Sequence, residues 1–278
     1  MNRKLKLWDS YPQWKDAEKA WDAQAEKASL SHPLKQLSNL PQMPGITKET
    51  ASFLKYKSLR YIIQHDEKKV LPKYFFKHPI RYTLSFLKSI VRKSSYTREG
   101  DLFFYGCKDE KEFEKALEKP KTLLVLGFSY CHKPLECPSK RFSSECIHDL
   151  SHPVCQQCFI GKAIHAAPEK EIELLLIPTI HYIGEKIFET VDKNPDREVL
   201  FIITACEMTL KMFGDWGNMV GIKGIGIRLD GRICNTMKAF ELSEKGVKPG
   251  LTVVLPPTQQ KILRLLQIRR GSKAPGTV

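Results

Sequence analysis

The chain gathers soft metal ligands into one segment near its middle. Five of its eight cysteines and three of its eight histidines lie between residues 130 and 163. The tightest spacing is Cys155-x2-Cys158, which lets two sulfurs turn toward one ion or cluster. The other ligand types in the segment are Cys131, Cys137, Cys146, His132, His148 and His152. This density predicts a metal or cluster site rather than a set of stray buried thiols.

Two kinds of metal site can be drawn from this segment. Zinc takes four Cys or His ligands in tetrahedral geometry, and a compact zinc site would combine Cys146, His148 or His152, Cys155 and Cys158. An iron–sulfur cluster prefers thiolates alone, usually four, and the matching set is Cys131, Cys137, Cys155 and Cys158. A redox dithiol at the Cys155-x2-Cys158 pair also stays open, because the following FIGKAIHAA can begin a helix.

Two further cysteines occupy positions where a thiol can react. Cys206 ends the apolar run EVLFIITA and opens a helix-like segment, and ligands of open α/β sheets bind at the carboxyl ends of strands. A helix N-terminus also lowers the pKa of a thiol, so Cys206 is a candidate ligand or catalytic nucleophile. Cys234 lies in RICNT, beside two residues that can hydrogen-bond. Cys107 precedes a charged helix and is expected to be a bystander.

Four of these motifs, taken in order, give the chain a resemblance to a known family. A strand leads to Cys131 with Cys137-Pro138 after it, followed by Cys155-x2-Cys158-x-Ile160-Gly161, Ala205-Cys206-Glu207 and Cys234-Asn235-Thr236. In these pieces, over residues 120–240, the chain resembles an uncharacterised bacterial and archaeal domain-of-unknown-function family. That family is the one numbered 116, and it brings no settled activity. The chain departs from its pattern in a long basic N-terminal region and in the extra Cys146.

The resemblance implies a shared set of site cysteines, namely Cys131, Cys137, Cys155, Cys158, Cys206 and Cys234. Cys107 and Cys146 fall outside that set. Six thiols exceed the needs of one tetrahedral zinc, which favours an iron–sulfur cluster with a redox or cluster-assisted role. Two alternatives stay open. One is a zinc-stabilised binding protein that recruits an anionic partner, and the other is a metal-free thiol enzyme that uses Cys206.

Three other features have structural explanations that compete with function. The run GIKGIG at 221–226 has the glycine spacing of a phosphate loop, but a strand-like run follows it instead of a helix, so close backbone packing is expected. His181 follows a strand end and is a candidate for the same cleft as Cys206. Glu207 is either an acid–base group or a favourable charge in the first turn of a helix.

The elements that must position these residues alternate between strands and helices. Strand-like runs are expected at 101–106, 121–128, 171–178, 198–205 and 251–256, and helices at 111–119, 184–193, 207–216 and 258–270. A Gly-rich strand pair is expected at 221–233, with Asp230-Gly231 as its hairpin turn. This alternation predicts an α/β fold with a largely parallel sheet and flanking helices over residues 101–278.

A basic helical N-terminal region, residues 1–100, is expected before that domain. It carries 20 basic and 9 acidic side chains, within a chain of net charge +14. Trp8, Trp14 and Trp21 recur at helical intervals and are expected to dock an arm onto the body. Two helices with interleaved aromatic residues are expected over 51–93. Their charge indicates an anionic partner, which would be a membrane surface, an acidic protein or a nucleic acid.

The compartment follows from what the sequence lacks. No run of 18 uncharged apolar residues is present, and the basic start has no apolar stretch of a secretory signal behind it. We therefore expect no transmembrane segment and a cytoplasmic location, with peripheral membrane contact through the basic helices. Thiols stay reduced there, which favours metal or thiol chemistry over disulfides.

Overall fold

A computed structural model describes residues 6–35, 45–52, 54–80, 82–84, 87, 96–217, 221–248 and 250–271, with backbone only at 71, 215 and 216. Its centre is a six-stranded sheet of order β1-β2-β6-β5-β3-β4. The strands of this sheet are β1 (Thr97–Glu99), β2 (Leu102–Tyr105), β3 (Thr122–Ser129), β4 (Ile172–Ile177), β5 (Glu198–Ala205) and β6 (Lys223–Arg228). Strands β6, β5, β3 and β4 run parallel, and β1 and β2 add an antiparallel edge. The predicted α/β fold with a mostly parallel sheet is confirmed.

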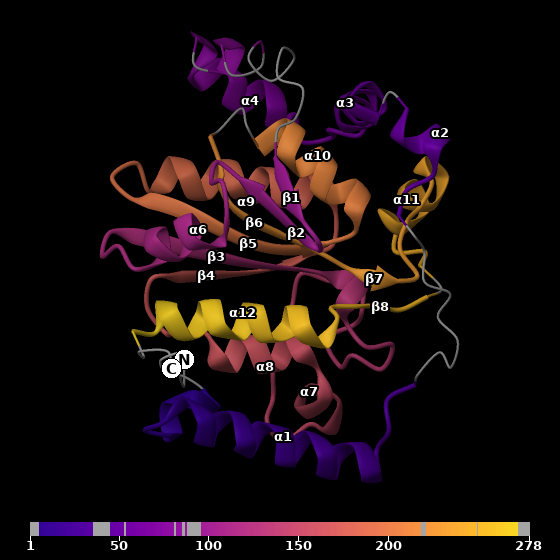
Figure 1. Cartoon of the computed structure of the whole chain (residues 1–278). Helices are drawn as coiled ribbons and strands as arrows, with labels where there is room; N and C mark the ends of the chain where they lie inside the picture. Colours follow the sequence, from indigo (N-terminus) through magenta and orange to yellow (C-terminus); the bar gives the residue numbers. More distant parts are fainter. Residues whose placement is uncertain are drawn as a thin grey trace.

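Helices cover both faces of this sheet (Figure 1). One face carries α6 (Glu110–Leu117), α8 (Phe159–Ala166) and α12 (Pro256–Arg269), with α7 (Pro153–Gln157) and α1 (Trp14–Ser31) outside them. The other face carries α3 (Leu54–Gln64), α4 (Val70–Lys77), α9 (Ile180–Lys193), α10 (Glu207–Gly217) and α11 (Met237–Ser243). The remaining short elements are η1 (Leu7–Ser10), α2 (Lys48–Ala51), η2 (Tyr130–His132), β7 (Asp230–Gly231) and β8 (Thr252–Val253).

The strands are apolar on both sides because both faces are buried. Leu124 and Leu126 of β3 pack into the core beneath α12, while Val125 between them packs into the core beneath α9. This period-two alternation between two buried faces produces the continuous apolar runs of the sequence. Burial on both faces is why β3 and β5 read as unbroken hydrophobic strands.

The order of the strands creates a crevice between β3 and β5. The chain leaves β3 toward the α8 face and then forms β4 at one edge, whereas it leaves β5 toward the α10 face and then forms β6 on the other side. Connections that diverge to opposite faces leave a gap at the carboxyl ends of the two strands. Cys131 follows β3 by two residues and Cys206 follows β5 directly, so both lie at this crevice.

The expected hairpin at Asp230-Gly231 is wrong. These two residues form β7, which pairs antiparallel with β8 rather than turning back onto β6. Leu229 N–H donates instead to the carbonyl of Ala205 at 2.9 Å, which carries the chain past the end of β5. Asp-Gly favours a turn only where the flanking runs can pair with each other. Here the partner of β6 is already β5 on one side and β2 on the other.

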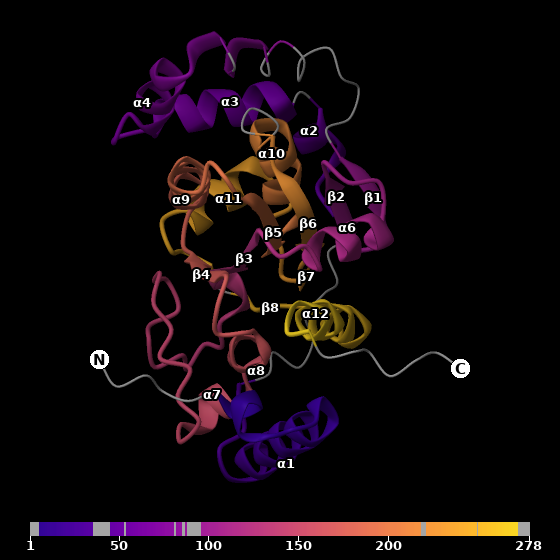
Figure 2. The same ribbon diagram turned by 90° about the vertical axis from the view of Figure 1, so that its left-hand side faces the viewer.

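The N-terminal arm docks onto the body, as the tryptophan spacing predicted. Trp8 and Trp21 are each 3% exposed, and both join the core beneath α8. Their ring centroids lie 6.2 Å apart. In Figure 2, α1 lies across the end of the molecule next to α7 and α8. The tertiary contacts of the arm therefore come from its aromatic residues, and charged contacts add to them, such as that of Asp22 with Lys162 at 2.6 Å.

The basic helical segment covers the opposite face. Tyr61 and Ile62 of α3 and Tyr74 of α4 are buried against α9 and α10, and β1 extends the same sheet as the body. The second helix expected over 79–93 falls partly outside the described residues. Where it is described, Ile80, Leu84 and Leu87 are exposed. Among the described helices, none is long and apolar enough to cross a bilayer.

Candidate functional site

Three of the predicted site cysteines meet in one cavity at the carboxyl ends of the parallel strands. Cys131, Cys206 and Cys234 all line a space of about 500 Å³, counted with its solvent-open part. The residues that end β3, β4 and β5 line it too, namely Ser129, Ile177 and Ala205. The cavity thus occupies the crevice where open α/β sheets bind ligands. We call it the thiol cleft.

Cys206 sits at the N-terminus of α10, and its sulfur is surrounded by donors. Its carbonyl accepts from Leu210 N–H at 3.0 Å, so it precedes the first turn of the helix. Its Sγ lies 3.2 Å from the Thr209 hydroxyl and also accepts from the Thr209 backbone N–H. A thiolate in this position receives hydrogen bonds and the positive end of the helix dipole. The sequence interval Cys206-x-x-Thr209 is that of a side-chain N-cap.

Cys234 is the second sulfur of the cleft, and a buried lysine holds it. The ammonium of Lys248 donates to its Sγ at 3.2 Å. Lys248 is only 9% exposed and Cys234 only 4%. The thiol of Cys234 in turn hydrogen-bonds Cys206. Burial of an ammonium is costly unless an anion balances it, so Lys248 stabilises one negative charge on this pair of sulfurs.

The pair therefore shares one proton. The hydrogen bond from Cys234 lowers the pKa of Cys206, and the Lys248 charge and Thr209 lower it further against the opposing effect of burial. The same hydrogen bond, together with burial, raises the pKa of Cys234. Because Lys248 touches Cys234 while the helix end touches Cys206, the charge belongs to the pair, with Cys206 as the more anionic member. Burial raises the pKa of Cys131, which stays a thiol.

Two groups at the cleft were not predicted from the sequence. One is Lys248, in a polar stretch that gives no signal of burial. The other is Glu244, which lines the cleft and accepts from Ile180 N–H at 2.8 Å. Burial and the Cys206 charge raise the pKa of Glu244 to about 8, although the Ile180 contact lowers it. Glu244 is therefore largely protonated at neutral pH and can donate a hydrogen bond into the cleft.

A second group consists of four cysteines in the segment between β3 and α8, namely Cys137, Cys146, Cys155 and Cys158. The cysteines of this group influence one another electrostatically. Burial, with smaller contributions from the charges of Cys146 and Cys137, raises the pKa of Cys155 to about 11 and that of Cys158 to about 12. We call these four the loop cysteines. The structure thus separates Cys131 from Cys137, Cys155 and Cys158, and it adds Cys146 to them.

A buried lysine also accompanies the loop cysteines. Lys133 is 1% exposed, and its ammonium donates to the carbonyls of Lys140, Ser143 and Glu145 at 3.2, 3.0 and 2.7 Å. It also donates to the Ser143 hydroxyl at 2.9 Å. These four oxygens are neutral. Burial lowers the pKa of Lys133, and the charges of Cys137, Cys146 and Cys158 oppose that effect.

The loop cysteines have the chemistry of a metal-binding set, although their side chains do not converge on one point. In the described part of the chain, no three Cys, His, Asp or Glu side chains are arranged to hold a metal ion. The donors are nevertheless four soft thiols on one short segment, a set that both zinc and iron–sulfur clusters take.

The histidines of the segment have other contacts. His152 caps α7 by accepting from Val154 N–H, His148 Nδ1 lies 3.0 Å from the Cys146 carbonyl, and His132 stacks on Phe159.

The remaining candidates have structural roles. Cys107 is buried behind β2 and donates to the Gly224 carbonyl at 3.6 Å, as expected of a bystander. Glu207 pairs with Arg98 and Lys211 at 3.3 and 3.1 Å, and it does not line the thiol cleft. A Cβ at Gly224 would lie 2.3 Å from the Phe201 carbonyl oxygen, so close packing explains this glycine of the GIKGIG run.

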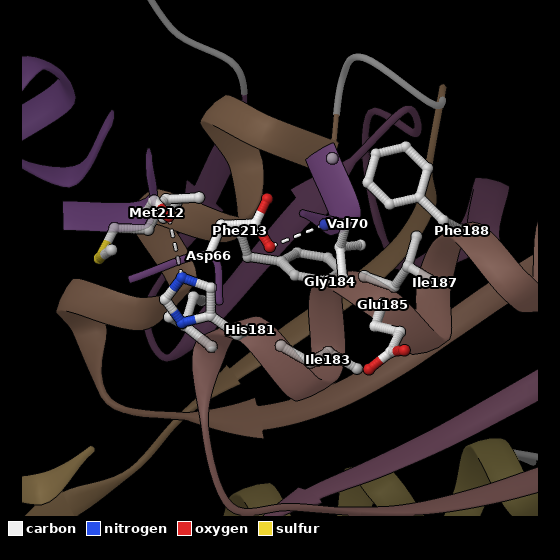
Figure 3. A pocket seen from close by; sticks show the side chains of 13 residues that line it. Asp66, Val70, His181, Ile183, Gly184, Glu185, Ile187, Phe188, Met212 and Phe213 are labelled. Carbon is white, nitrogen blue, oxygen red and sulfur yellow. Dashed lines mark hydrogen bonds between the residues drawn. The ribbon is translucent and has the colours of Figure 1, made fainter. Parts of the chain in front are cut away.

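An apolar pocket adjoins the thiol cleft. It lies between α3, α4, α9 and α10 and measures about 640 Å³ with its solvent-open part. Figure 3 shows the side chains of Ile183, Ile187, Phe188, Met212 and Phe213 around it. His181 lines this pocket rather than the cleft, and its Nε2 lies 3.0 Å from the Ile62 carbonyl. Ile180, Ile183 and Phe213 line both spaces, so the pocket and the cleft share a wall.

No family model, curated protein or solved structure matches this chain.

Proposed function

We propose that this chain is a cysteine-ligated metalloprotein whose centre is formed by the loop cysteines, Cys137, Cys146, Cys155 and Cys158. We assign the centre an iron–sulfur cluster with a redox role. The observation that carries the proposal is the buried ammonium of Lys133, which has only neutral oxygens as hydrogen-bond partners. A resident anionic group beside it would explain why the charge is tolerated.

Charge balance favours such a group. Burying one isolated ammonium costs on the order of several kcal/mol of folding free energy unless an opposite charge lies nearby. The charges that act on Lys133 are those of Cys137, Cys146 and Cys158 and, as the smallest contribution, the Glu145 carboxylate. As free thiols these cysteines are neutral, because burial raises the pKa of Cys146 and Cys158. Bound to a metal, thiols are deprotonated, and four thiolates leave an excess of negative charge.

The architecture of the segment gives a second argument. Residues 133–152 contain no helix or strand, yet they connect β3 to α7 inside a packed domain. Irregular connections of this length are uncommon unless something orders them. Lys133 orders the first part through carbonyls of residues 140–145, and a metal held by the loop cysteines would order the whole.

Zinc is the alternative occupant of the same four thiols, and the thiol count does not separate the two. The six-cysteine argument for a cluster is weaker in the folded chain, because Cys131, Cys206 and Cys234 lie together in the thiol cleft. We keep the cluster as the assignment to be tested, and one zinc per chain is the result that would replace it. The shared cysteines of the resembled family would then divide between two sites.

Metal analysis tests the proposal. We would purify the chain without oxygen and measure its visible spectrum together with iron, acid-labile sulfide and zinc. Stoichiometric iron and sulfide support the cluster, whereas one zinc per chain replaces the cluster with a zinc centre. Metal-free, folded protein refutes both.

Two matched variants then distinguish the four-cysteine set from the family-based set. Cys146→Ser should lose the metal and Cys131→Ser should keep it. The reverse result would restore the assignment that includes Cys131 and omits Cys146.

We also propose that the α3–α4 face contacts an anionic membrane surface in the cytoplasm. Exposed apolar side chains lie among the basic residues of this face, with Phe76 at 75% and Ile80 at 77% exposure. Basic and apolar side chains together suit the interface of an anionic bilayer. Sedimentation with phosphatidylserine vesicles should exceed that with neutral vesicles and should fall with added salt. No binding to either kind of vesicle would exclude a membrane contact.

A further inference from the structure

The thiol cleft contains a reactive pair that is independent of the metal centre. We infer that Cys206 and Cys234 form a redox-active dithiol that reduces disulfides carrying apolar groups, with the apolar group held in the pocket beside the cleft. The geometry that supports this has three parts: two sulfurs that line one cleft, a fixed cation on one of them, and an apolar space that shares a wall with the cleft. None of these residues belongs to the loop cysteines.

The two sulfurs differ in their surroundings, which assigns their roles. Cys206 is at the helix N-terminus with Thr209 at 3.2 Å, so it is the attacking sulfur. Cys234 sits behind it against the Lys248 ammonium at 3.2 Å, so it is the resolving sulfur. A reactive dithiol needs one sulfur that is anionic and a second near it. Both sulfurs line the same cleft, and the Thr209 hydroxyl and the helix N-terminus favour the thiolate of Cys206.

The exchange balances with the groups present and one substrate. The Cys206 thiolate attacks one sulfur of R–S–S–R, which forms a Cys206–S–S–R bond and releases RS⁻. The Cys234 sulfur then attacks Cys206, forms the Cys206–Cys234 disulfide and releases the second R–S group, which leaves with the proton that the pair had shared. The disulfide substrate is reduced by two electrons to RS⁻ and RSH, and the dithiol is oxidised by two electrons.

Lys248 supports each stage of this exchange. It offsets the single negative charge of the resting pair, and it stays beside Cys234 when that sulfur becomes the nucleophile. Its position is set by Arg141, whose Nη1 donates to the Lys248 carbonyl at 2.8 Å. The cation is therefore built into the cleft rather than supplied by a mobile surface side chain.

The adjoining pocket defines the substrate class. Ile180, Ile183 and Phe213 separate it from the thiol cleft and line both. A disulfide at Cys206 would place its R group along this wall, where apolar side chains surround it. An anionic R group would lose its hydration there and would meet the carboxylates of Asp66 and Glu185, which also line the pocket. We therefore expect neutral, apolar disulfides to react in preference to anionic ones.

Gly184 provides a way to fill the pocket without disturbing the cleft. It lies on α9, lines the pocket and does not line the cleft (Figure 3). A Cβ built at Gly184 meets no atom within 4 Å, so a larger side chain can enter the space. Gly184→Leu should fold and should block the apolar R group while it leaves both sulfurs in place.

The test uses 4,4′-dithiodipyridine as the neutral aromatic disulfide and oxidised glutathione as the charged one. With the intact chain we expect a fast phase in which two thiopyridone molecules are released, and a Cys206–Cys234 disulfide in the peptide digest. Cys206→Ser should remove the fast phase, and Cys234→Ser should release one equivalent and keep the mixed disulfide. Cys107→Ser is the matched control and should change nothing. Dithiodipyridine is the more reactive disulfide toward any thiolate because its leaving group is better, so the pocket is tested by a ratio of rates. The dithiodipyridine rate relative to the glutathione rate should fall about tenfold in Gly184→Leu, a change of about 1.4 kcal/mol in relative barrier.

Other outcomes would overturn the inference. A fast phase that survives Cys206→Ser, or a disulfide that joins other cysteines, rules out this dithiol. A ratio of the dithiodipyridine rate to the glutathione rate that is unchanged in Gly184→Leu rules out the apolar substrate. Metal content measured in the same preparation keeps this result separate from the metal proposal, because each can fail while the other holds.

Discussion

Arg141 connects the segment of the loop cysteines to the thiol cleft, and replacing it should weaken both. Its guanidinium donates to four carbonyl oxygens on two stretches of chain. They belong to Lys133 at 3.2 Å, Cys131 at 3.1 Å, Lys248 at 2.8 Å and Gly250 at 2.5 Å. Arg141→Lys keeps the positive charge, but one ammonium lacks the planar fork of donors that reaches all four acceptors on the two segments.

The cost can be worked from those contacts. A hydrogen bond from a charged donor contributes roughly 1.5–3 kcal/mol, and losses at one site are less than additive. With three of the four bonds lost, we expect Arg141→Lys to lower the free energy of unfolding by about 3 kcal/mol. For a chain of this size that corresponds to a fall in Tm of about 6–10 °C.

The assay compares urea unfolding and Cys206 alkylation in matched variants. Arg264→Lys is the control, because Arg264 is 54% exposed on α12 and pairs only with surface carboxylates. It should change the free energy of unfolding by about 0.5 kcal/mol or less. Arg141→Lys should also slow alkylation of Cys206, since Lys248 loses its anchor. Stability and alkylation both equal to those of the control would refute the role of Arg141.

Three further predictions concern single groups. The contribution of Glu244 to the free energy of unfolding should fall as pH rises from about 4.5 to about 8, because the folded chain holds a proton on Glu244 that the unfolded chain has released. Glu244→Gln should therefore make the urea midpoint depend less on pH over that range. Thr209→Val removes a donor that lowers the pKa of Cys206, so the midpoint of its alkylation against pH should move upward, and an unchanged midpoint would contradict the contact. Gly224→Ala should cost about 2 kcal/mol or more in urea unfolding, since its Cβ meets a carbonyl at 2.3 Å. Gly184→Ala, which has open space, should cost almost nothing; equal losses would argue against packing at Gly224.

The strands and helices that follow local patterns could be predicted from the sequence. The apolar runs of β3 and β5 and the alternation with helices specified the α/β sheet, because burial on both faces leaves continuous hydrophobic stretches. The position of Cys206 at a strand end followed from the same pattern. Asp230-Gly231 was misjudged because β6 takes its neighbours from distant parts of the chain, which local turn propensity does not reveal.

The composition of the site could be predicted only in part. The division of the cysteines depends on which strand ends meet. The sequence placed Cys131 in one set with both Cys137 and Cys206, whereas Cys131 and Cys206 line the thiol cleft and Cys137 does not. Lys248 and Lys133 were missed for a different reason. The sequence does not distinguish a buried lysine from a solvated one, and no local pattern separates these two from the other basic residues among the 45 in the chain.

The order of the strands also sets the order in which the two thiol groups can assemble during synthesis. Cys137 to Cys158 lie within 22 consecutive residues, so they can meet as soon as that stretch leaves the ribosome. Cys131, Cys206, Cys234 and Lys248 meet only after β5 has docked beside β3 and the chain has been made beyond residue 248. Contacts this distant in sequence form late. The nascent chain thus offers the local four thiols to a metal before the reactive pair exists.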